Sequence, residues 1–155
     1  MDDFDFLHGS WDVANRRLTT PLGSGPGTWG EFPGHAVVRP LFGGADNIDE
    51  ITFPTLRRQG VTLRLFDREM ERWSLHWSDS RKGRLDPPVV GGFTGDRGDF
   101  HGWDTYNDRP IRVHFAWYRL GPHTARWEQR FSPDDGRSWE LNWVMDLTRT
   151  AQVDA

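Results

Sequence analysis

The sequence predicts an all-β fold: a closed, antiparallel, up-and-down barrel of about ten strands in meander order, with little or no helix. Three observations lead to this prediction. Apolar side chains recur at every second position along most of the chain, which is the spacing of a strand with one buried face. Short runs rich in Gly, Pro, Asp and Asn separate these segments, as expected of turns. Nowhere do apolar residues keep a helical period for three turns.

A β-hairpin near the end of the chain shows this pattern most clearly. Its predicted strands are residues 125–131 and 139–149, and the turn-forming run SPDDGRS at 132–138 separates them. We expect the rest of the chain to repeat this unit until the sheet closes. One face of the hairpin is unusually aromatic, because it is predicted to carry Ala125, Trp127, Gln129, Phe131, Trp139, Leu141, Trp143, Met145, Leu147 and Arg149.

Eight strands precede the hairpin, each an alternating segment between turn-forming runs. Short connections make sequential strands pair antiparallel, and closing the sheet removes its two exposed edges. The 155 residues are therefore predicted to form one domain, 1–155. After a short helical turn or lead-in at 3–7, the strands are predicted at 11–18, 29–40, 46–53, 61–66, 73–79, 89–94, 99–105 and 111–118. The apolar face is predicted to hold Val61, Leu63 and Leu65 on the fourth strand, Trp73, Leu75 and Trp77 on the fifth, and Ile111, Val113, Phe115 and Trp117 on the eighth.

Composition narrows the function. The chain has no Cys, which excludes disulfides, thiol catalysis and zinc–thiolate sites. Its net charge of −4 disfavours a duplex nucleic-acid partner. No apolar run approaches the ~20 residues of a membrane helix, and the acidic start MDDFDF lacks the features of a signal peptide. The sequence thus predicts a cytoplasmic protein with neither a nucleic-acid nor a membrane partner.

Two ends of the chain carry a family resemblance. Gly9-Ser10-Trp11 opens the first strand and Arg149 ends the last, an arrangement that resembles the calycin superfamily, in which such an arginine packs across the tryptophan at the barrel base. Together with the segments FLHGSW, WEQRF and DDGRSWELNW, it is most similar to the Trp-rich, lipocalin-like barrels of bacteria. Only residues 150–155 follow Arg149, so we expect a plain barrel of the fatty-acid-binding or nitrobindin type without the lipocalin helix. The resemblance implies a binding cavity inside the barrel.

The hairpin turn carries a second resemblance. Residues 132–139, SPDDGRSW, resemble the Asp-box turn of sialidase propellers. A propeller needs several copies and this chain has one, so we interpret the motif as turn chemistry and not as a catalytic site.

The end opposite Trp11 and Arg149 is predicted to be the open mouth. The loops at that end, 19–28, 54–60, 80–88, 106–110 and 133–138, are on average longer than those at the base. They carry seven Lys or Arg against four Asp, which is a positive rim on an acidic protein. Such a rim favours an anionic ligand by steering, although solvated loop arginines explain the same composition.

Polar residues that share a face with inward aromatics are the candidate site. Arg17 and Asp79 would either pair with each other or hold a ligand near the mouth, and a structural polar network is the alternative. The tryptophans nearest the mouth could stack on a ligand. The candidate ligand-binding residues are Asn15, Arg17, Trp29, Trp77, Asp79, Trp127, Gln129 and Trp139.

These residues predict that the barrel binds a partly apolar small molecule, with an anionic group as a further expectation and no cofactor or metal. Two alternatives stay open, so the sequence leaves undecided whether the protein is an enzyme. One is a cofactor-free isomerase, cyclase or lyase with Asp79 or Asp104 as the base beside Arg17. The other, by resemblance to nitrobindin-like barrels, is a haem-binding protein, which would need His114 to face the cavity. His114 and His76 are expected to point to solvent, and no metal-binding His spacing occurs.

Overall fold

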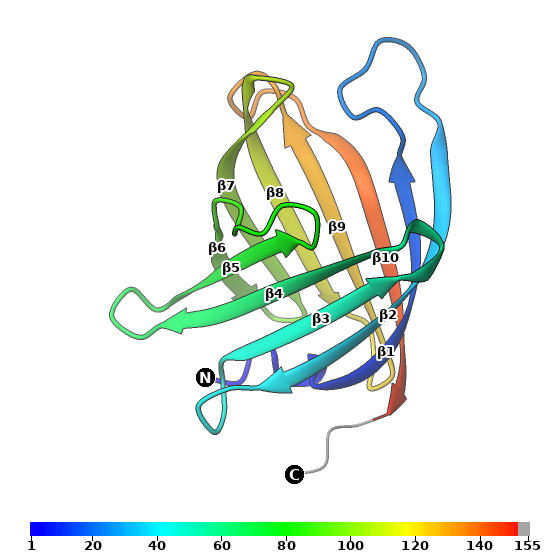
Figure 1. Ribbon diagram of the computed structural model, residues 1–155. Helices are drawn as coiled ribbons and strands as arrows, with labels where there is room; N and C mark the ends of the chain where they lie inside the picture. Colours follow the sequence, from blue (N-terminus) through cyan, green and yellow to red (C-terminus); the bar gives the residue numbers. More distant parts are fainter. Residues whose placement is uncertain (152–155) are drawn as a thin grey trace.

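The computed structural model describes residues 1–151 and forms a closed barrel of ten antiparallel strands in meander order (Figure 1). The predicted fold class is therefore confirmed. The helical segments of the described chain are two 3-10 turns, η1 (Asp5–Leu7) and η2 (Pro54–Leu56). The strands are β1 (Gly9–Leu18), β2 (Trp29–Pro40), β3 (Asn47–Phe53), β4 (Arg58–Asp67), β5 (Arg72–Asp79), β6 (Val89–Thr94), β7 (Arg97–Tyr106), β8 (Arg109–Arg119), β9 (Thr124–Ser132) and β10 (Glu140–Ala151). Over the described residues, no helix has the length and apolar character needed to cross a membrane.

The barrel closes where β1 pairs with β10, and the pairing brings Trp11 opposite Arg149. The Arg149 guanidinium lies 4.3 Å from the centroid of the Trp11 ring. It also donates hydrogen bonds to the backbone carbonyls of Phe6, His8 and Pro122. One cation thus ties the N-terminal segment, the β8–β9 side of the barrel and the final strand together. The predicted neighbourhood of Trp11 and Arg149 is confirmed.

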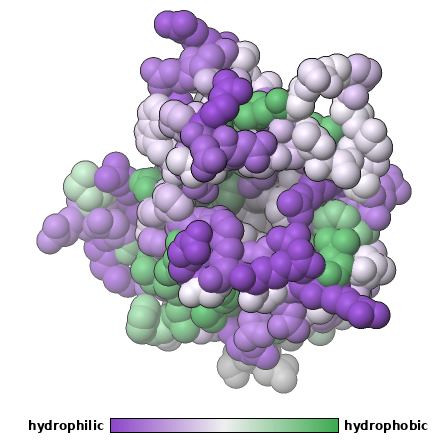
Figure 2. Space-filling view, turned by 45° about the horizontal axis from the view of Figure 1, so that its top comes forward, coloured by the Kyte–Doolittle hydropathy of each residue, from purple (hydrophilic) through white to green (hydrophobic). Residues whose placement is uncertain are grey.

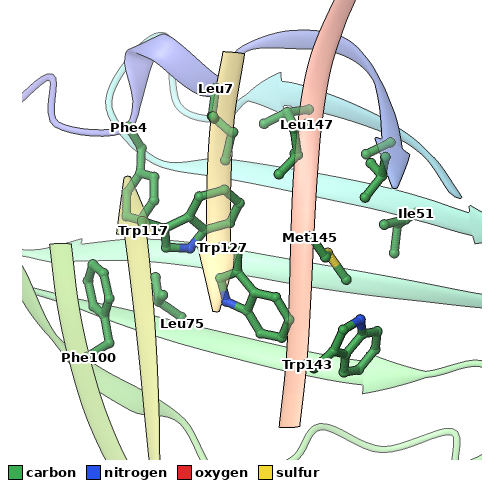
Figure 3. Packing of buried hydrophobic residues seen from close by; sticks show 14 of the residues in the cluster. Phe4, Leu7, Ile51, Leu75, Phe100, Trp117, Trp127, Trp143, Met145 and Leu147 are labelled. Carbon is green, nitrogen blue, oxygen red and sulfur yellow. The ribbon is translucent and has the colours of Figure 1, made fainter. Parts of the chain in front are cut away.

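The N-terminal segment closes the base of the barrel. Phe4 and Leu7 are fully buried and reach from this segment into the aromatic core near Trp117 and Trp127 (Figure 3). The Trp11 indole N–H donates to the carbonyl of Leu7 at 2.8 Å, and the Trp73 indole N–H donates to the Asp3 carboxylate at 3.0 Å. Buried indole N–H groups need such acceptors. We call residues 3–7 the base plug.

Strand β4 faces the opposite way from the prediction. Val61, Leu63 and Leu65 are half-buried on the outer face, whereas Gly60 and Arg64 are buried. Gly60 belongs inside because a Cβ atom there would lie 1.9 Å from the Trp77 ring. Arg64 belongs inside because it meets charged and aromatic partners there, which are described below. The rule that the more apolar face points inward is wrong for this strand.

A β-bulge shifts the alternation of β10. The register moves between Leu141 and Trp143, so Asn142 has no paired residue across on β9. Because of the extra residue, side chains before and after Asn142 no longer follow one alternation. The prediction that Trp139 shares a face with Trp143 is therefore wrong. The Trp139 ring instead lies 6.0 Å from His101 and 5.9 Å from His114, on the outer face of the barrel.

Candidate ligand-binding cavity

A cavity of about 350 Å³ lies inside the barrel. At one end its walls include Pro21, Leu56, Lys82 and Tyr106, which come from the loops of the predicted mouth. At the other end it reaches Leu7 of the base plug. Figure 2, which brings the upper end of Figure 1 forward, shows a hollow ringed mainly by hydrophilic residues. The volume falls in the lower part of the range for pockets that hold small organic ligands.

The loop after β5 forms part of the mouth. Strands β5 and β6 pair over only three residues, Trp73–Leu75 against Val89–Gly91. Beyond them, the loop at residues 80–88 takes over the pairing, because the Asp86 amide donates to the carbonyl of Trp77 at 2.7 Å. The Ser78 hydroxyl holds the same loop through the carbonyl of Arg84, also at 2.7 Å. The barrel wall between β5 and β7 is therefore completed at the mouth by a loop instead of a strand.

Aromatic side chains dominate the walls. The Trp127 ring packs edge-on against Trp143 at 5.3 Å and against Phe115 at 5.0 Å. Trp77 lines the cavity from β5 and Phe53 from β3. Large flat faces of this kind suit a ligand with an apolar or aromatic body.

Four cationic and four carboxylate side chains line the cavity: Arg17, Arg58, Arg64, Lys82, Asp49, Asp79, Asp86 and Asp104. Six of them form ion pairs. Arg64 contacts Asp49 at 2.5 Å, Lys82 contacts Asp86 at 2.8 Å, and Arg58 pairs with Asp79. Within residues 1–151, Arg17 has no ion pair and no side-chain hydrogen bond. Among the described residues, Arg17 is therefore the cation of the lining that is not in an ion pair, and Asp104 is the corresponding carboxylate.

Arg17 is held in place by an aromatic ring. Its guanidinium lies 4.7 Å from the centroid of Trp143, and the Trp143 indole N–H donates to the Asn15 carbonyl oxygen at 3.0 Å. Asn15 is buried behind this indole and is not part of the lining, so it positions Trp143. Burial, and then the nearby charge of Arg58, lower the pKa of Arg17 from its usual value. An anion brought to this place would favour the charged guanidinium and so oppose this lowering of the pKa.

Asp79 does not pair with Arg17, although the sequence allowed that pairing. Its carboxylate instead accepts hydrogen bonds from Arg58 and from the Arg81 amide. Partial burial works to raise the pKa of Asp79, but these donors outweigh it, and the pKa lies below its usual value. A carboxylate held in this way attracts a proton weakly. Asp104 also lines the cavity, and it accepts the Thr105 amide at 2.7 Å.

The other candidates divide into two groups. Trp77, Trp127 and Gln129 line the cavity, and the Gln129 amide donates to Asn142 at 2.9 Å. Trp29 and Trp139 are not among the lining residues and are exposed at 41% and 36%. The structure thus brings Arg17, Trp77, Asp79, Asp104, Trp127 and Gln129 together around one cavity.

Five charged residues of the lining were not among the predicted site candidates: Asp49, Arg58, Arg64, Lys82 and Asp86. Arg64 was not a candidate because the opposite face of β4 was predicted to point inward. Arg58 was assigned to a loop, although β4 begins at this residue. Asp49 is not among the ligand-binding or catalytic candidates predicted from the sequence. One signal was available: Asn47 and Asp49 alternate with Ile51 and Phe53 on β3, which places a carboxylate on an apolar face and implies a buried cation opposite.

The histidines do not fit a haem ligand. His114 lies on the outer face, where it is buried beneath Trp139 and donates to the Asp99 carboxylate at 2.8 Å. The prediction that His114 points away from the cavity is therefore correct, but the prediction that it is exposed to solvent is wrong. None of the His residues in the described chain lines the cavity. Residues 1–151 also contain no cluster of three His, Cys, Asp or Glu side chains suited to a metal ion.

Comparisons with known proteins bear on the fold. No family model and no curated protein sequence matches the chain. Among solved structures, it resembles an S-type phycobiliprotein lyase, CPES, from Guillardia theta, with a TM-score of 0.61 and 10% identity. The match covers 95% of this chain and 90% of the lyase chain. At this identity the likeness concerns the fold alone. With the closed ten-stranded sheet, it supports a calycin-like barrel.

Proposed function

We propose that the protein binds a small molecule in the barrel cavity, with an apolar or aromatic body against the tryptophans and one anionic group at Arg17. The observation that supports this proposal is that the Arg17 guanidinium, among the described residues, has no ion-pair partner. A partly buried cation without an ion-pair partner costs free energy, and an anionic ligand would offset that cost. The fold of the phycobiliprotein lyase is compatible with a ligand inside such a barrel. The cytoplasmic location and the absence of nucleic-acid and membrane partners stay predictions from the sequence.

A matched pair of dyes tests this proposal. The anionic dye 1-anilinonaphthalene-8-sulfonate and the neutral N-phenyl-1-naphthylamine share one ring system and differ by the sulfonate. We expect the native protein to bind one molecule of the anionic dye, about tenfold more tightly than the neutral one, because charge-assisted hydrogen bonds contribute about 1.5–3 kcal/mol. Fluorescence titration measures both dissociation constants.

The variant Arg17→Gln provides the control. It keeps a polar side chain of similar length and removes the charge, so we expect it to lower the affinity for the anionic dye and leave that for the neutral dye unchanged. Added salt should weaken the anionic dye more in the native protein than in the variant. Equal affinities for both dyes, or no effect of Arg17→Gln, would show that Arg17 does not hold the anion.

One observation keeps an enzymatic role as a second candidate. Within the described chain, Asp104 is the carboxylate of the lining that has no cationic partner, and it could act as a base toward a ligand held by Arg17. We propose on this basis that a cofactor-free isomerase, cyclase or lyase reaction could occur in the same cavity. Product analysis on molecules that bind decides between the two candidates, because Asp104→Asn should then abolish turnover while binding persists. Unchanged ligands after incubation would leave binding as the function.

A further inference from the structure

A second polar group lies at the deep end of the cavity, away from Arg17 and the mouth loops. Asp49 on β3 is 6% exposed and belongs to the lining. Its partner Arg64 on β4 lies 5.4 Å from the ring centroids of both Phe4 and Trp117. Because Phe4 is part of the base plug, this places the ion pair beside the closed base. The cavity walls around it are apolar, with Val38, Ile51 and Leu75 among the lining residues.

Arg64 leaves most of the hydrogen-bonding capacity of Asp49 unused. One guanidinium nitrogen meets a carboxylate oxygen of Asp49 at 2.5 Å, and another donates to Asn47 at 2.9 Å. An ionised carboxylate can accept about four hydrogen bonds. Within residues 1–151, no donor other than Arg64 reaches Asp49. A buried acceptor with free lone pairs at a cavity wall is costly unless something donates to it.

We propose that Asp49 is a floor subsite that accepts a hydrogen bond from an O–H or N–H group of the ligand. This inference rests on the proposed function, because it concerns the other end of the same molecule. Burial raises the pKa of Asp49, and the charge and hydrogen bond of Arg64 oppose that rise. The ligand class becomes specific: an anion at the mouth end, an apolar ring or chain between the tryptophans, and a hydroxyl or amine-type donor at the floor.

A role in ligand binding accounts for the presence of an ion pair in this place. A buried Arg–Asp pair contributes little net stability, and apolar residues of similar volume often replace such a pair without loss. A pair that served only the core would therefore be readily replaced. A pair that presents a carboxylate to the cavity selects ligands, because an analogue without a donor desolvates that carboxylate and adds no hydrogen bond to the one from Arg64.

Two neutral probes of the same ring system test the floor subsite without involving Arg17. The probe 2-naphthol carries a hydroxyl donor, and 2-methoxynaphthalene has the same ring and oxygen but no donor. Calorimetric titration of the native protein should show 2-naphthol binding about tenfold more tightly. The double variant Asp49→Leu/Arg64→Met removes the acceptor without leaving an unpaired charge, so we expect the preference to disappear. Arg17→Gln should keep it.

The outcomes separate this inference from the proposed function. Equal affinity of the two probes for the native protein would overturn the floor subsite, as would a preference that survives in the double variant. Water alone would then satisfy Asp49. The anionic-dye test at Arg17 could still succeed in that case. Binding of the anionic dye in preference to the neutral dye shows that the double variant folds. The variant Asp49→Asn, which keeps Arg64 and its ring contacts, gives a second measurement of the ratio of affinities for 2-naphthol and 2-methoxynaphthalene.

Discussion

Gly60 shows how one residue without a side chain decides which way a strand faces. The Trp77 ring occupies the space that a Cβ atom at position 60 would need, with three ring carbons at 1.9, 2.5 and 2.6 Å from it. Trp77 can therefore lie flat across β4 and form part of the cavity wall. With Gly60 inward, the strand's period of two also turns Thr62 and Arg64 inward.

We expect Gly60→Ala to destabilise the protein by about 1–3 kcal/mol, because the added methyl group must displace Trp77. Gly92→Ala is the matched control, since no atom lies within 4 Å of a Cβ atom at that strand position. Urea denaturation followed by far-UV circular dichroism measures both. Equal stabilities of the two variants would mean that Trp77 does not pack over Gly60.

Single residues also mark the limit of what the sequence reveals. Arg17 could be predicted as inward because it alternates with Trp11 and Val13 on one strand. Arg64 could not, because its strand carries three aliphatic residues on the opposite face. An alternating pattern shows only which face of a strand is more apolar. The face of β4 that points inward is set by contacts with Trp77 and Asp49 on the neighbouring strands. Such contacts between strands are outside any single-strand pattern.

At the scale of elements, the turn between β9 and β10 holds itself together through Asp134. Its carboxylate accepts the Ser138 amide at 2.8 Å, the Ser138 hydroxyl at 2.6 Å and the Ser132 hydroxyl at 2.9 Å. The Ser132 oxygen in turn accepts the Gly136 amide at 2.8 Å. The resemblance to an Asp-box therefore identified a turn correctly. Its residues lie outside the cavity lining, which agrees with a structural role.

This turn makes a pH-dependent contribution to stability. The hydrogen bonds from Ser138 lower the pKa of Asp134 from its usual 3.8 to about 2. A lowered pKa in the folded state stabilises the fold above pH 3.8, and the contribution disappears as pH falls toward 2. We expect Asp134→Asn to lower the melting temperature at pH 7, and we expect the difference from the native protein to shrink between pH 4 and 2.

The neighbouring substitution Asp135→Asn serves as the control for the turn. The Asp135 side chain is 75% exposed and approaches Arg112 only at 3.8 Å, so its loss should change the melting temperature little at any pH. Calorimetry of the three proteins across this range measures the effect. A constant difference between Asp134→Asn and the native protein at all pH values would contradict the assignment.

Arg149 on β10 stabilises the closure of the sheet through its contacts with Trp11 and with three backbone carbonyls. We expect Arg149→Ala to cost about 2–4 kcal/mol, since it removes a cation–π contact and three charge-assisted hydrogen bonds. Arg149→Lys should recover only part of this loss, because an ammonium group cannot reach several carbonyls in a planar fork. Chemical denaturation gives both values, and a fully stable Lys variant would show that charge alone is sufficient.

Over the whole molecule, the barrel is closed at one end and open at the other. The base plug inserts Phe4 between aromatic partners, with the Trp73 and Phe93 rings each 4.9 Å away. The mouth is rimmed by loops, including the loop at 80–88 that replaces a strand pairing. The asymmetry makes the interior a cavity with one entrance. A ligand must therefore present one end to Arg17 near the mouth and the other to the base.

We expect Phe4→Ala to lower the free energy of unfolding by about 3–5 kcal/mol, the usual cost of emptying a well-packed aromatic site. Phe42→Ala is the control, since Phe42 is 83% exposed and its loss should change stability by less than about 0.5 kcal/mol. Guanidinium denaturation compares the two. Similar stability of both variants would show that the base plug does not form part of the core.

The global architecture could be predicted from the sequence because it depends on repeated local signals. Ten alternating segments with short turns leave few arrangements other than a closed meander, and Trp11 with Arg149 marked where it closes. The bulge at Asn142 and the outward position of Trp139 could not be predicted. A bulge adds one residue without changing composition, and it reverses every side chain beyond it.

The most direct test of the account is where an anionic apolar molecule binds. Each of the nine tryptophans gives one indole N–H resonance in a ¹H–¹⁵N NMR spectrum, so the set maps the whole barrel. On titration with 1-anilinonaphthalene-8-sulfonate, we expect the resonances of Trp77, Trp127 and Trp143 to shift together with one-to-one saturation. Shifts confined to the exposed Trp29, Trp103 and Trp139 would place binding on the outer surface and contradict the account.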